Sequence, residues 1–331
     1  MVGVRVSLAT EAGSERPNED FAVAGPGVVV VVDGAGTPAA LPTGCVHGTA
    51  WYARRLAVAL HGRATAGVTA GATAAGAARG TPGGAVGPGL DECLADAIEE
   101  VAALHGGACD LGDPMTPSAT VAAVRIREDQ VEWLVLADAT VALDLAPTAP
   151  GGTGEGRPSP GGTDSGRPSP APFDRGAPSR DRLGQGGPLV VSDHRVTQVT
   201  RAQRLRMADE LASLGPTGRF HALVRAQRSA MNVQGGYWVA AADPKAAAEA
   251  LTGSVPSARV RLAALLSDGA ARVVDDFGVM DWPGLLALLA AEGPEGLIAR
   301  TRELEHGDPD RRRWPRGKRH DDATAAVLRS A

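Results

Sequence analysis

The sequence predicts an α+β domain in which antiparallel strand pairs are combined with helices. Residues 21–24 and 28–32 are apolar runs joined by a Gly-Pro-Gly turn, and residues 118–127 and 131–136 form a second pair around a polar turn. Runs joined by so short a turn form hairpins, whose strands are antiparallel. The five consecutive valines at 28–32 indicate a strand that is buried on both faces, so this strand is placed at the centre of the domain.

The remaining elements follow from apolar periodicity and turn residues. Residues 48–61 and 90–105 predict two helices, and the Ala/Gly/Thr-rich residues 62–89 between them predict a loop. Further strands are expected at 2–10, 189–192, 235–242, 260–266 and 323–328. Further helices are expected at 197–214, at 275–291, at 294–306 and in a segment that begins at 244–251.

Domain organisation follows from length and local composition. A chain of 331 residues with 44% hydrophobic residues can bury a large core, which Ala, Val and Leu must build because aromatic residues make up only 3%. Residues 148–188 are rich in Pro, Gly and Ser and contain an imperfect repeat, GGTGEGRPSP followed by GGTDSGRPSP. Such a composition cannot form a core, so we predict one domain over 1–331 with a disordered insertion at 148–188.

Charge and cysteine usage exclude several classes of protein. The net charge of −5 gives no general reason to bind nucleic acid or an anionic membrane, and no apolar window is long enough to span a bilayer. The first residues show no signal-peptide pattern. The three cysteines are odd in number and lack CxxC spacing, so we predict neither a disulfide framework nor a zinc site. A cytoplasmic monomer is expected.

Aspartates recur at the ends of the apolar strands. They are Asp20, Asp33, Asp138, Asp268 and Asp321. Each alone is explained by a turn or a helix cap. Together, without a matching set of Cys or His, they indicate an oxygen-ligand site for Mg²⁺ or Mn²⁺. The first hairpin also brings Glu19 and Asp20 near Asp33.

Four motifs give the chain a family resemblance. They are RPNED at 16–20, VDGAG at 32–36, SDG at 267–269 and DDAT at 321–324, in this order. The set resembles the metal-dependent serine/threonine protein phosphatases of type 2C, over nearly the whole chain apart from the insertion. The resemblance implies a four-layer α-β-β-α sandwich, with two stacked antiparallel sheets flanked by helices. It also implies two Mn²⁺ or Mg²⁺ ions, a possible third ion, and a phosphorylated protein as substrate.

The resemblance implies metal-binding roles for five positions. Asp33 looks like the aspartate that bridges both ions, and the Gly34 carbonyl looks like a further ligand. Asp268 and Asp321 look like the remaining carboxylates of the metal pair. Asp138 lies where bacterial members of the family hold a third, weaker ion.

Three residues of the first motif have implied roles around this pair. Glu19 looks like the residue that reaches a metal ion through water, and Asp20 looks like its support. Arg16 looks like the arginine that binds the substrate phosphate.

The chain departs from the family pattern at four places. The His or Met that follows Asp-Gly is Ala35, and the Gly-Gly after it is Gly36-Thr37. The GDS motif is ADA at 137–139, and the glycine expected before the Ser/Thr-Thr pair is absent from PSAT at 117–120. Arg16 lies one residue closer to Glu19 than usual. The metal carboxylates are present, so metal binding is better supported than a high catalytic rate.

We therefore predict metal-dependent hydrolysis of phosphoserine and phosphothreonine. A catalytically weak member that acts as a binding or regulatory module is the alternative, and a different dinuclear metal hydrolase is a third interpretation. The seven histidines are scattered and predicted to be structural or on the surface, with His320 beside Asp321 the one of interest. Cys45 and His47 are too close in sequence for a catalytic pair. The basic stretch 311–318 is predicted to be a solvated loop.

Overall fold

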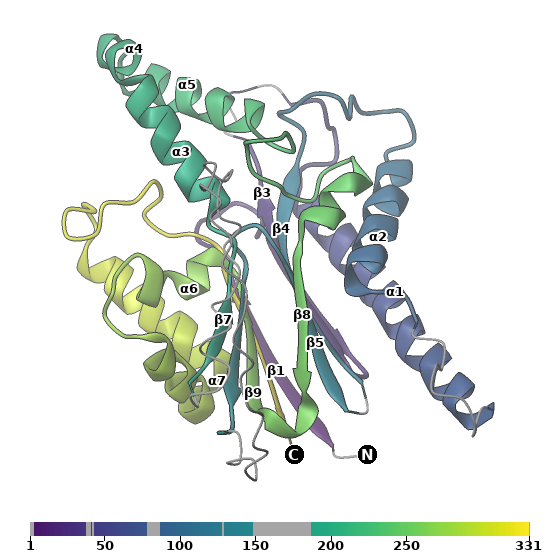
Figure 1. Cartoon of the computed structure of the whole chain (residues 1–331). Helices are drawn as coiled ribbons and strands as arrows, with labels where there is room; N and C mark the ends of the chain where they lie inside the picture. The colour runs from purple at the N-terminus through teal and green to yellow at the C-terminus, as the bar shows by residue number, and fades with distance from the viewer. Residues whose placement is uncertain are drawn as a thin grey trace, which may run out of the picture.

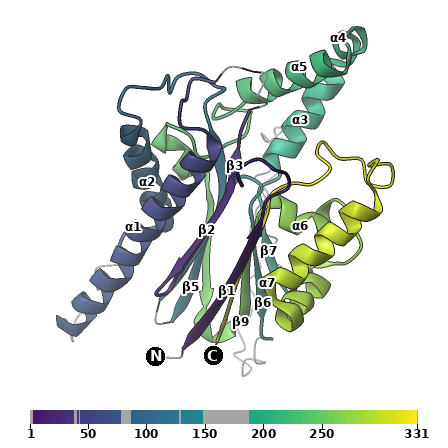
Figure 2. The same ribbon diagram turned by 180° about the vertical axis from the view of Figure 1, so that it is seen from behind.

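A computed structural model describes residues 3–37, 41, 43–77, 87–127, 129–147 and 187–330, without side chains at 67–77 and 330. Its centre consists of two stacked five-stranded sheets, with one pair of helices outside each (Figure 1). Figure 2 shows the same arrangement from behind, with the described ends of the chain close together at one end of the sheets. No described helix is long and apolar enough to cross a membrane.

The first sheet contains both predicted hairpins. Its strands, in spatial order, are β2 (Asp20–Gly25), β3 (Val28–Ala35), β4 (Ser118–Ile126), β5 (Gln130–Leu136) and β8 (Leu251–Pro256). All neighbouring strands pair antiparallel. The hairpin register is set by the turn at Gly27, whose φ of 72° suits glycine, and it places Asp20 directly opposite Asp33.

The second sheet joins the two ends of the chain. Its strands, in spatial order, are β1 (Val4–Glu11), β10 (Ala323–Ser330), β9 (Val260–Leu266), β6 (Thr140–Leu145) and β7 (Leu189–Val191). These pairs are also antiparallel. Because β9 and β10 are antiparallel neighbours, the residues just after β9 and just before β10 meet at the same end of this sheet.

Three apolar layers hold the sandwich together. The valine strand feeds two of them, because its side chains alternate: Val28, Val30 and Val32 face α1 (Thr49–Ala77) and α2 (Leu90–Leu104), whereas Val29 and Val31 face the other sheet. The third layer lies between the second sheet and α6 (Asp268–Asp275) with α7 (Trp282–Gly307). The predicted four-layer sandwich and the doubly buried valine strand are therefore confirmed.

A helical segment stands beside one end of the sandwich. It comprises α3 (Arg195–Arg206), α4 (Ala208–Ser213) and α5 (Pro216–Ser229), and it projects from the sheets in Figure 1. The sequence predicted one helix at 197–214, whereas the chain breaks at Met207 into α3 and α4. The helix α5 and the strands β6 and β8 were not predicted.

Two predictions about local structure were wrong. Residues 62–77 continue α1 instead of forming a loop, because alanine favours helix and this stretch is alanine-rich. Residues 235–242 form no regular strand: they make isolated bridges to Ala119 and Met231, while Tyr237 and Val239 pack in a small cluster with residues of α3.

Two further boundaries differ from the prediction. The segment after Pro244 is a short 3₁₀ helix, Pro244–Glu249, which leads into β8. The predicted helix at 275–291 is the end of α6 and the start of α7, separated by a loop that ends at the N-cap Asp281. The break expected near 292–293 is present as a kink at Gly293 within α7, where φ is 76°. Of the predicted insertion at 148–188, residues 148–186 lie outside the described residues.

Candidate active site

The acidic residues at the strand ends of the two sheets come together at one end of the sandwich. Asp20 and Asp33 are register partners on β2 and β3. Asp268 is the first residue of α6, two residues after the end of β9, and Asp321 lies two residues before the start of β10. A backbone hydrogen bond from Ser267 to Thr324 (3.0 Å) ties these last two segments to each other. The fold therefore brings the segments that carry these four aspartates to the same end of the sandwich.

Mutual repulsion and burial dominate the electrostatics of this cluster. Burial raises the pKa of Asp33 well above its usual value, and the carboxylates of Asp20, Asp268, Asp321 and Asp138 raise it further. Burial likewise raises the pKa of Asp20 to about 7, and the charge of Asp268 adds to that effect. Carboxylates arranged in this way are stabilised by bound cations, because a cation removes the repulsion that opposes their ionisation.

Asp20 is the most deeply buried member of the cluster. Its exposed fraction is 4%, and neither carboxylate oxygen has a hydrogen-bond partner among the described residues. The hydroxyls of Thr324 and Ser267 lie near enough to lower the pKa of Asp20, although neither makes a hydrogen bond of ordinary geometry to its carboxylate. Ser267 Oγ accepts from the Thr324 amide (2.9 Å), and Thr324 Oγ1 contacts Thr10 Oγ1 (2.6 Å). A buried carboxylate without a partner is costly, so this position calls for a cation or for a proton.

Asp268 is held against the other acidic segments by close backbone packing. Burial and the charge of Asp321 raise the pKa of Asp268. The cations Arg272 and Lys318 and a hydrogen bond with Asp33 offset this effect in part. The next residue, Gly269, lies so near the Asp322 carbonyl that an added Cβ would be 2.0 Å from its oxygen. The glycine of the SDG motif is therefore required for β9 and β10 to bring their aspartates together.

Asp321 has two cationic partners. Lys318 Nζ donates to Asp321 Oδ1 (2.6 Å), and Arg272 donates to Oδ2 (3.1 Å). Burial lowers the pKa of Lys318, but the carboxylates of Asp321, Asp268 and Asp33 outweigh that effect and raise it. The Lys318 ammonium therefore lies among the same carboxylates that were predicted to bind metal ions.

A buried ionic network fixes Arg272 behind Asp321. Glu305 of α7 has no exposed surface and accepts from Arg272 (2.7 Å) and from Arg302 (2.7 Å). Arg302 also donates to the Asp321 carbonyl (2.8 Å). His320 contacts Glu305 through Nδ1 (2.8 Å), so this histidine belongs to the supporting network and not to the carboxylate cluster.

The acidic residue after Asp321 organises the first motif. Asp322 accepts the backbone amides of Gly13 (2.8 Å) and Glu19 (2.7 Å), which fixes the loop between β1 and β2 against β10. Burial raises the pKa of Glu19, whereas the charge of Lys318 and a hydrogen bond with Thr49 lower it in part. Asp322 thus holds the backbone of Glu19, while Thr49, at the start of α1, contacts its carboxylate.

Arg16 lies at the rim of the cluster. Its residue is exposed, and its charge acts on Glu19. Its backbone amide donates to Ser14 Oγ (3.2 Å), and no ion pair of its guanidinium is found among the described residues. The side chain is therefore available to an anion that approaches the acidic cluster.

Asp138 follows a strained turn between β5 and β6. The preceding Ala137 has φ of 65°, a left-handed conformation that costs an alanine about 1–2 kcal/mol. This geometry gives a physical reason for a glycine at the first position of a GDS motif. Burial raises the pKa of Asp138 to about 7, and Asp268 and Asp193 contribute further.

The helical segment reaches the edge of the site through Arg228. This buried residue of α5 donates to the carbonyls of Ala35 and Gly36 (2.5 and 3.0 Å) and to Ser118 Oγ (2.9 Å). It therefore fixes the loop that follows Asp33. Nothing in the sequence motifs pointed to this residue, which is separated from Gly36 by 192 positions.

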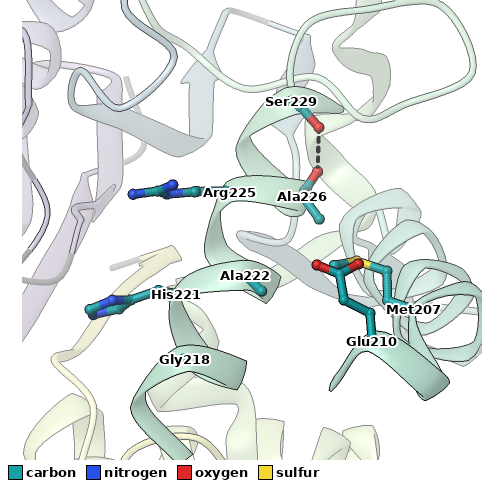
Figure 3. Close-up of a pocket in the computed structure, with 8 residues that line it drawn as sticks. All are labelled: Met207, Glu210, Gly218, His221, Ala222, Arg225, Ala226 and Ser229. Atoms are coloured by element: carbon teal, nitrogen blue, oxygen red, sulfur yellow. Dashed lines mark hydrogen bonds between the residues drawn. The ribbon is translucent and has the colours of Figure 1, made fainter. Parts of the chain in front are cut away.

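An open hollow lies between α4 and α5 of the helical segment. Figure 3 shows it, with a hydrogen bond from Ser229 Oγ to the Ala226 carbonyl (2.8 Å) at one end. Its lining residues are Met207, Glu210, Gly218, His221, Ala222, Arg225, Ala226 and Ser229. None of them is an acidic strand end, so the hollow is separate from the carboxylate cluster.

The donor set of the cluster fits hard divalent cations. All candidate side-chain ligands are carboxylates, and Asp20 is buried without a partner. Within the described residues, no three of these carboxylates bring an oxygen each within 4.8 Å of one another. The ion pairs of Asp321 with Arg272 and Lys318 hold its carboxylate toward these two cations.

Sequence reasoning located the carboxylates but not their partners. Asp20, Asp33, Asp268 and Asp321 come together, and Glu19 and Asp138 lie beside them. The cations Lys318 and Arg272, the loop anchor Asp322 and the clamp Arg228 were missed. Lys318 lay in a stretch predicted to be a solvated loop; its position three residues before Asp321 was the available signal.

Comparisons with known proteins give likeness in fold. No protein-family model and no curated protein matches the chain. Solved structures that resemble it include the catalytic domain of the serine/threonine protein phosphatase PstP in complex with two manganese ions (16% identity, TM-score 0.46, covering 98% of this chain and 97% of that one). Others are the serine/threonine phosphatase Stp1 from Staphylococcus aureus (13%, 0.45, 99% and 95%) and serine-threonine phosphatase 2C from Toxoplasma gondii (11%, 0.49, 98% and 94%). At identities and TM-scores this low, the chemistry of the site is inferred from the chain's own residues.

Proposed function

We propose that this protein hydrolyses phosphoserine and phosphothreonine on phosphoprotein partners with the help of Mn²⁺ or Mg²⁺. The observation that carries the proposal is the convergence of Asp20, Asp33, Asp268 and Asp321 from separate strand ends of both sheets. So many like charges, one of them buried without a partner, cost stability unless cations offset them.

Each carboxylate has a distinct part in this proposal. Asp33, at the centre of the cluster, would hold the ions together with Asp268, Asp321 and the Gly34 carbonyl. Asp138, in the turn between β5 and β6, would hold a third, weaker ion. When bound, the ions would lower the pKa of a shared water and offset charge on the phosphoryl oxygens.

The residues of the first motif orient water and substrate. Glu19, whose backbone Asp322 holds, would bind a water of the metal pair through its carboxylate, and the buried Asp20 would support it. The exposed Arg16 binds the phosphoryl oxygens of the substrate, as an arginine fork does well. Ala35 stands where the family pattern has His or Met, so the chain has no histidine at that position to act as a general acid.

Turnover measurements with a matched control test this proposal. p-Nitrophenyl phosphate and a phosphothreonine peptide are assayed with protein freed of Mn²⁺ and Mg²⁺, before and after Mn²⁺ is added. We expect activity with Mn²⁺ only, its loss in Asp33→Asn, and its retention in Asp144→Asn, which removes a surface ion pair with Arg261. Full activity without divalent ions, or wild-type turnover in Asp33→Asn, would refute the proposal.

One observation favours a second function, that of a catalytically weak binding module. Lys318 places an ammonium 2.6 Å from Asp321 Oδ1, where it competes with a divalent ion for the same oxygen. On this alternative the site binds a phosphorylated partner through Arg16 and Lys318 and turns over slowly. Measurable peptide affinity, with no turnover in either the wild type or Lys318→Ala at saturating Mn²⁺, would favour the module over the enzyme.

A further inference from the structure

Four sulfur and nitrogen ligands form a second cluster, apart from the acidic site. Cys45 and His47 lie in the loop before α1, and His105 and Cys109 lie in the turns after α2. One ligand atom from each residue lies within 4.8 Å of the other three. The two loops are joined by a backbone hydrogen bond from Asp110 to the Gly44 carbonyl (2.8 Å), and α1 and α2 pack side by side (Figure 1).

The spacing of the ligand atoms fits one tetrahedral ion. His47 Nδ1 lies 3.4 Å from Cys109 Sγ and 3.8 Å from Cys45 Sγ. Zinc binds sulfur at about 2.3 Å and histidine nitrogen at about 2.0–2.1 Å, so neighbouring ligands of a tetrahedral zinc are about 3.3–3.8 Å apart. Both distances are therefore those expected along the edges of such a site.

His105 is already prepared as a ligand. Its Nδ1 lies 2.9 Å from the Val101 carbonyl, which can only accept, so Nδ1 carries the proton and Nε2 keeps its lone pair. Nε2 is buried without a partner, in a residue with an exposed fraction of 4%. A metal-binding histidine characteristically donates its other ring nitrogen to a carbonyl or carboxylate in this way.

Backbone amides point at both sulfur atoms. The His47 amide donates to Cys45 Sγ (3.3 Å), and the Val46 amide donates to Cys109 Sγ (3.4 Å). Such donors stabilise negative charge on sulfur, as metal-bound thiolates require. Glycines make the geometry possible, because Gly106 and Gly107 have φ of 59° and 76° and turn the chain back so that Cys109 meets His47.

An aromatic wall covers the cluster. The Trp51 ring stacks on His47, with centroids 4.2 Å apart, and meets His105 edge-on at 4.9 Å. The indole thus fixes the orientation of both imidazoles and shields them from water. Burial raises the pKa of the Cys45 thiol, and neighbouring Cys109 adds to this effect, so Cys45 lacks the lowered pKa of a nucleophilic cysteine.

We propose that Cys45, His47, His105 and Cys109 form a closed structural zinc site that joins the start of α1 to the end of α2. Two thiolates and two imidazoles in a tetrahedron select zinc over the hard ions of the acidic cluster. Four protein ligands leave no open position, so the site is structural. It stabilises the loop that leads to Thr49, which contacts Glu19.

The prediction against a zinc site relied on cysteine spacing. The ligands follow a C-x-H and an H-x₃-C pattern that are separated by 57 residues, and neither contains a CxxC pair. Only the packing of α1 against α2 brings the two halves together. Among the described residues all three cysteines are free thiols, in agreement with the predicted lack of a disulfide framework.

Zinc content of the purified full-length chain tests the proposal. We expect one equivalent of zinc per chain by elemental analysis, retained in the presence of excess Mn²⁺. Cys109→Ser and Cys45→Ser should each lose affinity for zinc by at least about 100-fold, since even outer-shell changes cost 10–100-fold. Cys93→Ser is the matched control, because Cys93 is also buried, on α2, but outside the cluster. A wild type without zinc, or equal zinc loss in the Cys93→Ser control, would overturn the proposal.

Cobalt spectroscopy makes the test independent of the folding of the variants. Wild-type protein loaded with Co²⁺ should show the intense visible bands of a tetrahedral site and a thiolate-to-metal charge-transfer band in the near ultraviolet. Absence of these bands would contradict the assignment. A thiol titration of protein purified without reductant should find Cys45 and Cys109 unoxidised; a disulfide between them would contradict it as well.

Discussion

Substitution of Asp20 separates a metal-binding role from a structural one, because the two roles predict changes of opposite sign in the free energy of unfolding of the metal-free protein. The Asp20 carboxylate is buried, has no hydrogen-bond partner and has a pKa of about 7 in place of 3.8. Ionising it in the folded, metal-free protein therefore costs about 4 kcal/mol at pH 8, at about 1.36 kcal/mol per pKa unit.

Asp20→Asn removes this cost but leaves a buried amide without partners, which costs about 1–3 kcal/mol. We therefore expect the metal-free variant to be more stable than the wild type at pH 8 by about 1–3 kcal/mol. The raised pKa means that the folded protein binds the proton more tightly than the unfolded chain. The stabilisation that the wild type gains from protonated Asp20 is complete below pH 3.8, the pKa in the unfolded chain, and is lost as the pH rises to about 7, the pKa in the folded protein. The stability advantage of the variant should therefore be about 3 kcal/mol smaller at pH 5 than at pH 8.

Urea unfolding of both proteins at pH 5 and pH 8, without divalent ions and then with Mn²⁺, measures these differences. Mn²⁺ at about 1,000 times its Kd should reverse the order at pH 8, because it would stabilise the wild type by about 4.1 kcal/mol, more than the advantage of the variant. Asp322→Asn is the control: its carboxylate accepts two backbone amides, so its loss should destabilise at either pH. A metal-free Asp20→Asn variant less stable than the wild type at pH 8 would refute the reasoning.

Three further predictions concern the surroundings of the cluster. Lys318→Ala should tighten Mn²⁺ binding about 3–10-fold by calorimetry, because the exposed ammonium no longer competes for Asp321; unchanged affinity would show that it does not compete. Asp138→Asn should lower turnover yet leave the tight Mn²⁺ affinity within about twofold, as a ligand of the weaker third ion alone would; loss of tight binding would move Asp138 into the metal pair. Ala137→Gly should leave the free energy of unfolding unchanged or raise it by up to about 1 kcal/mol, because it relieves a φ of 65°, whereas Ala139→Gly in the core should lower it; a larger loss in Ala137→Gly would contradict the strain argument.

The sheets were predictable from sequence because their signals are local. The valine run, the two hairpin turns and the apolar runs at 260–266 and 323–328 each specify a strand without reference to the rest of the chain. The Ala-rich residues 62–77 were misassigned because low complexity was given more weight than the high helix propensity of alanine. Tyr237 and Val239 alternate as strand residues do, but they pack in a small cluster with α3 and join neither sheet.

The acidic residues of the candidate site were predictable, whereas its cations were not. Aspartates at strand ends are visible in sequence, and sheet topology brings them together. The pairing of Arg272 with Asp321 depends on where α7 places Glu305, which no local pattern encodes, whereas the only signal for Lys318 was its position three residues before Asp321. The Cys45 cluster depends on helix packing in the same way.

Equilibrium binding of Mn²⁺ tests the central claim most directly. Calorimetric titration of the zinc-retaining wild type should find two tight Mn²⁺ ions per chain, because Asp33, Asp268 and Asp321 come together from separate strand ends and repel one another unless cations are bound. Asp33→Asn should lose both, since one neutral oxygen cannot bridge two dications, while Asp144→Asn binds as the wild type does. Two tightly bound ions in Asp33→Asn, or none in the wild type, would contradict the assignment of this cluster as a dinuclear metal centre.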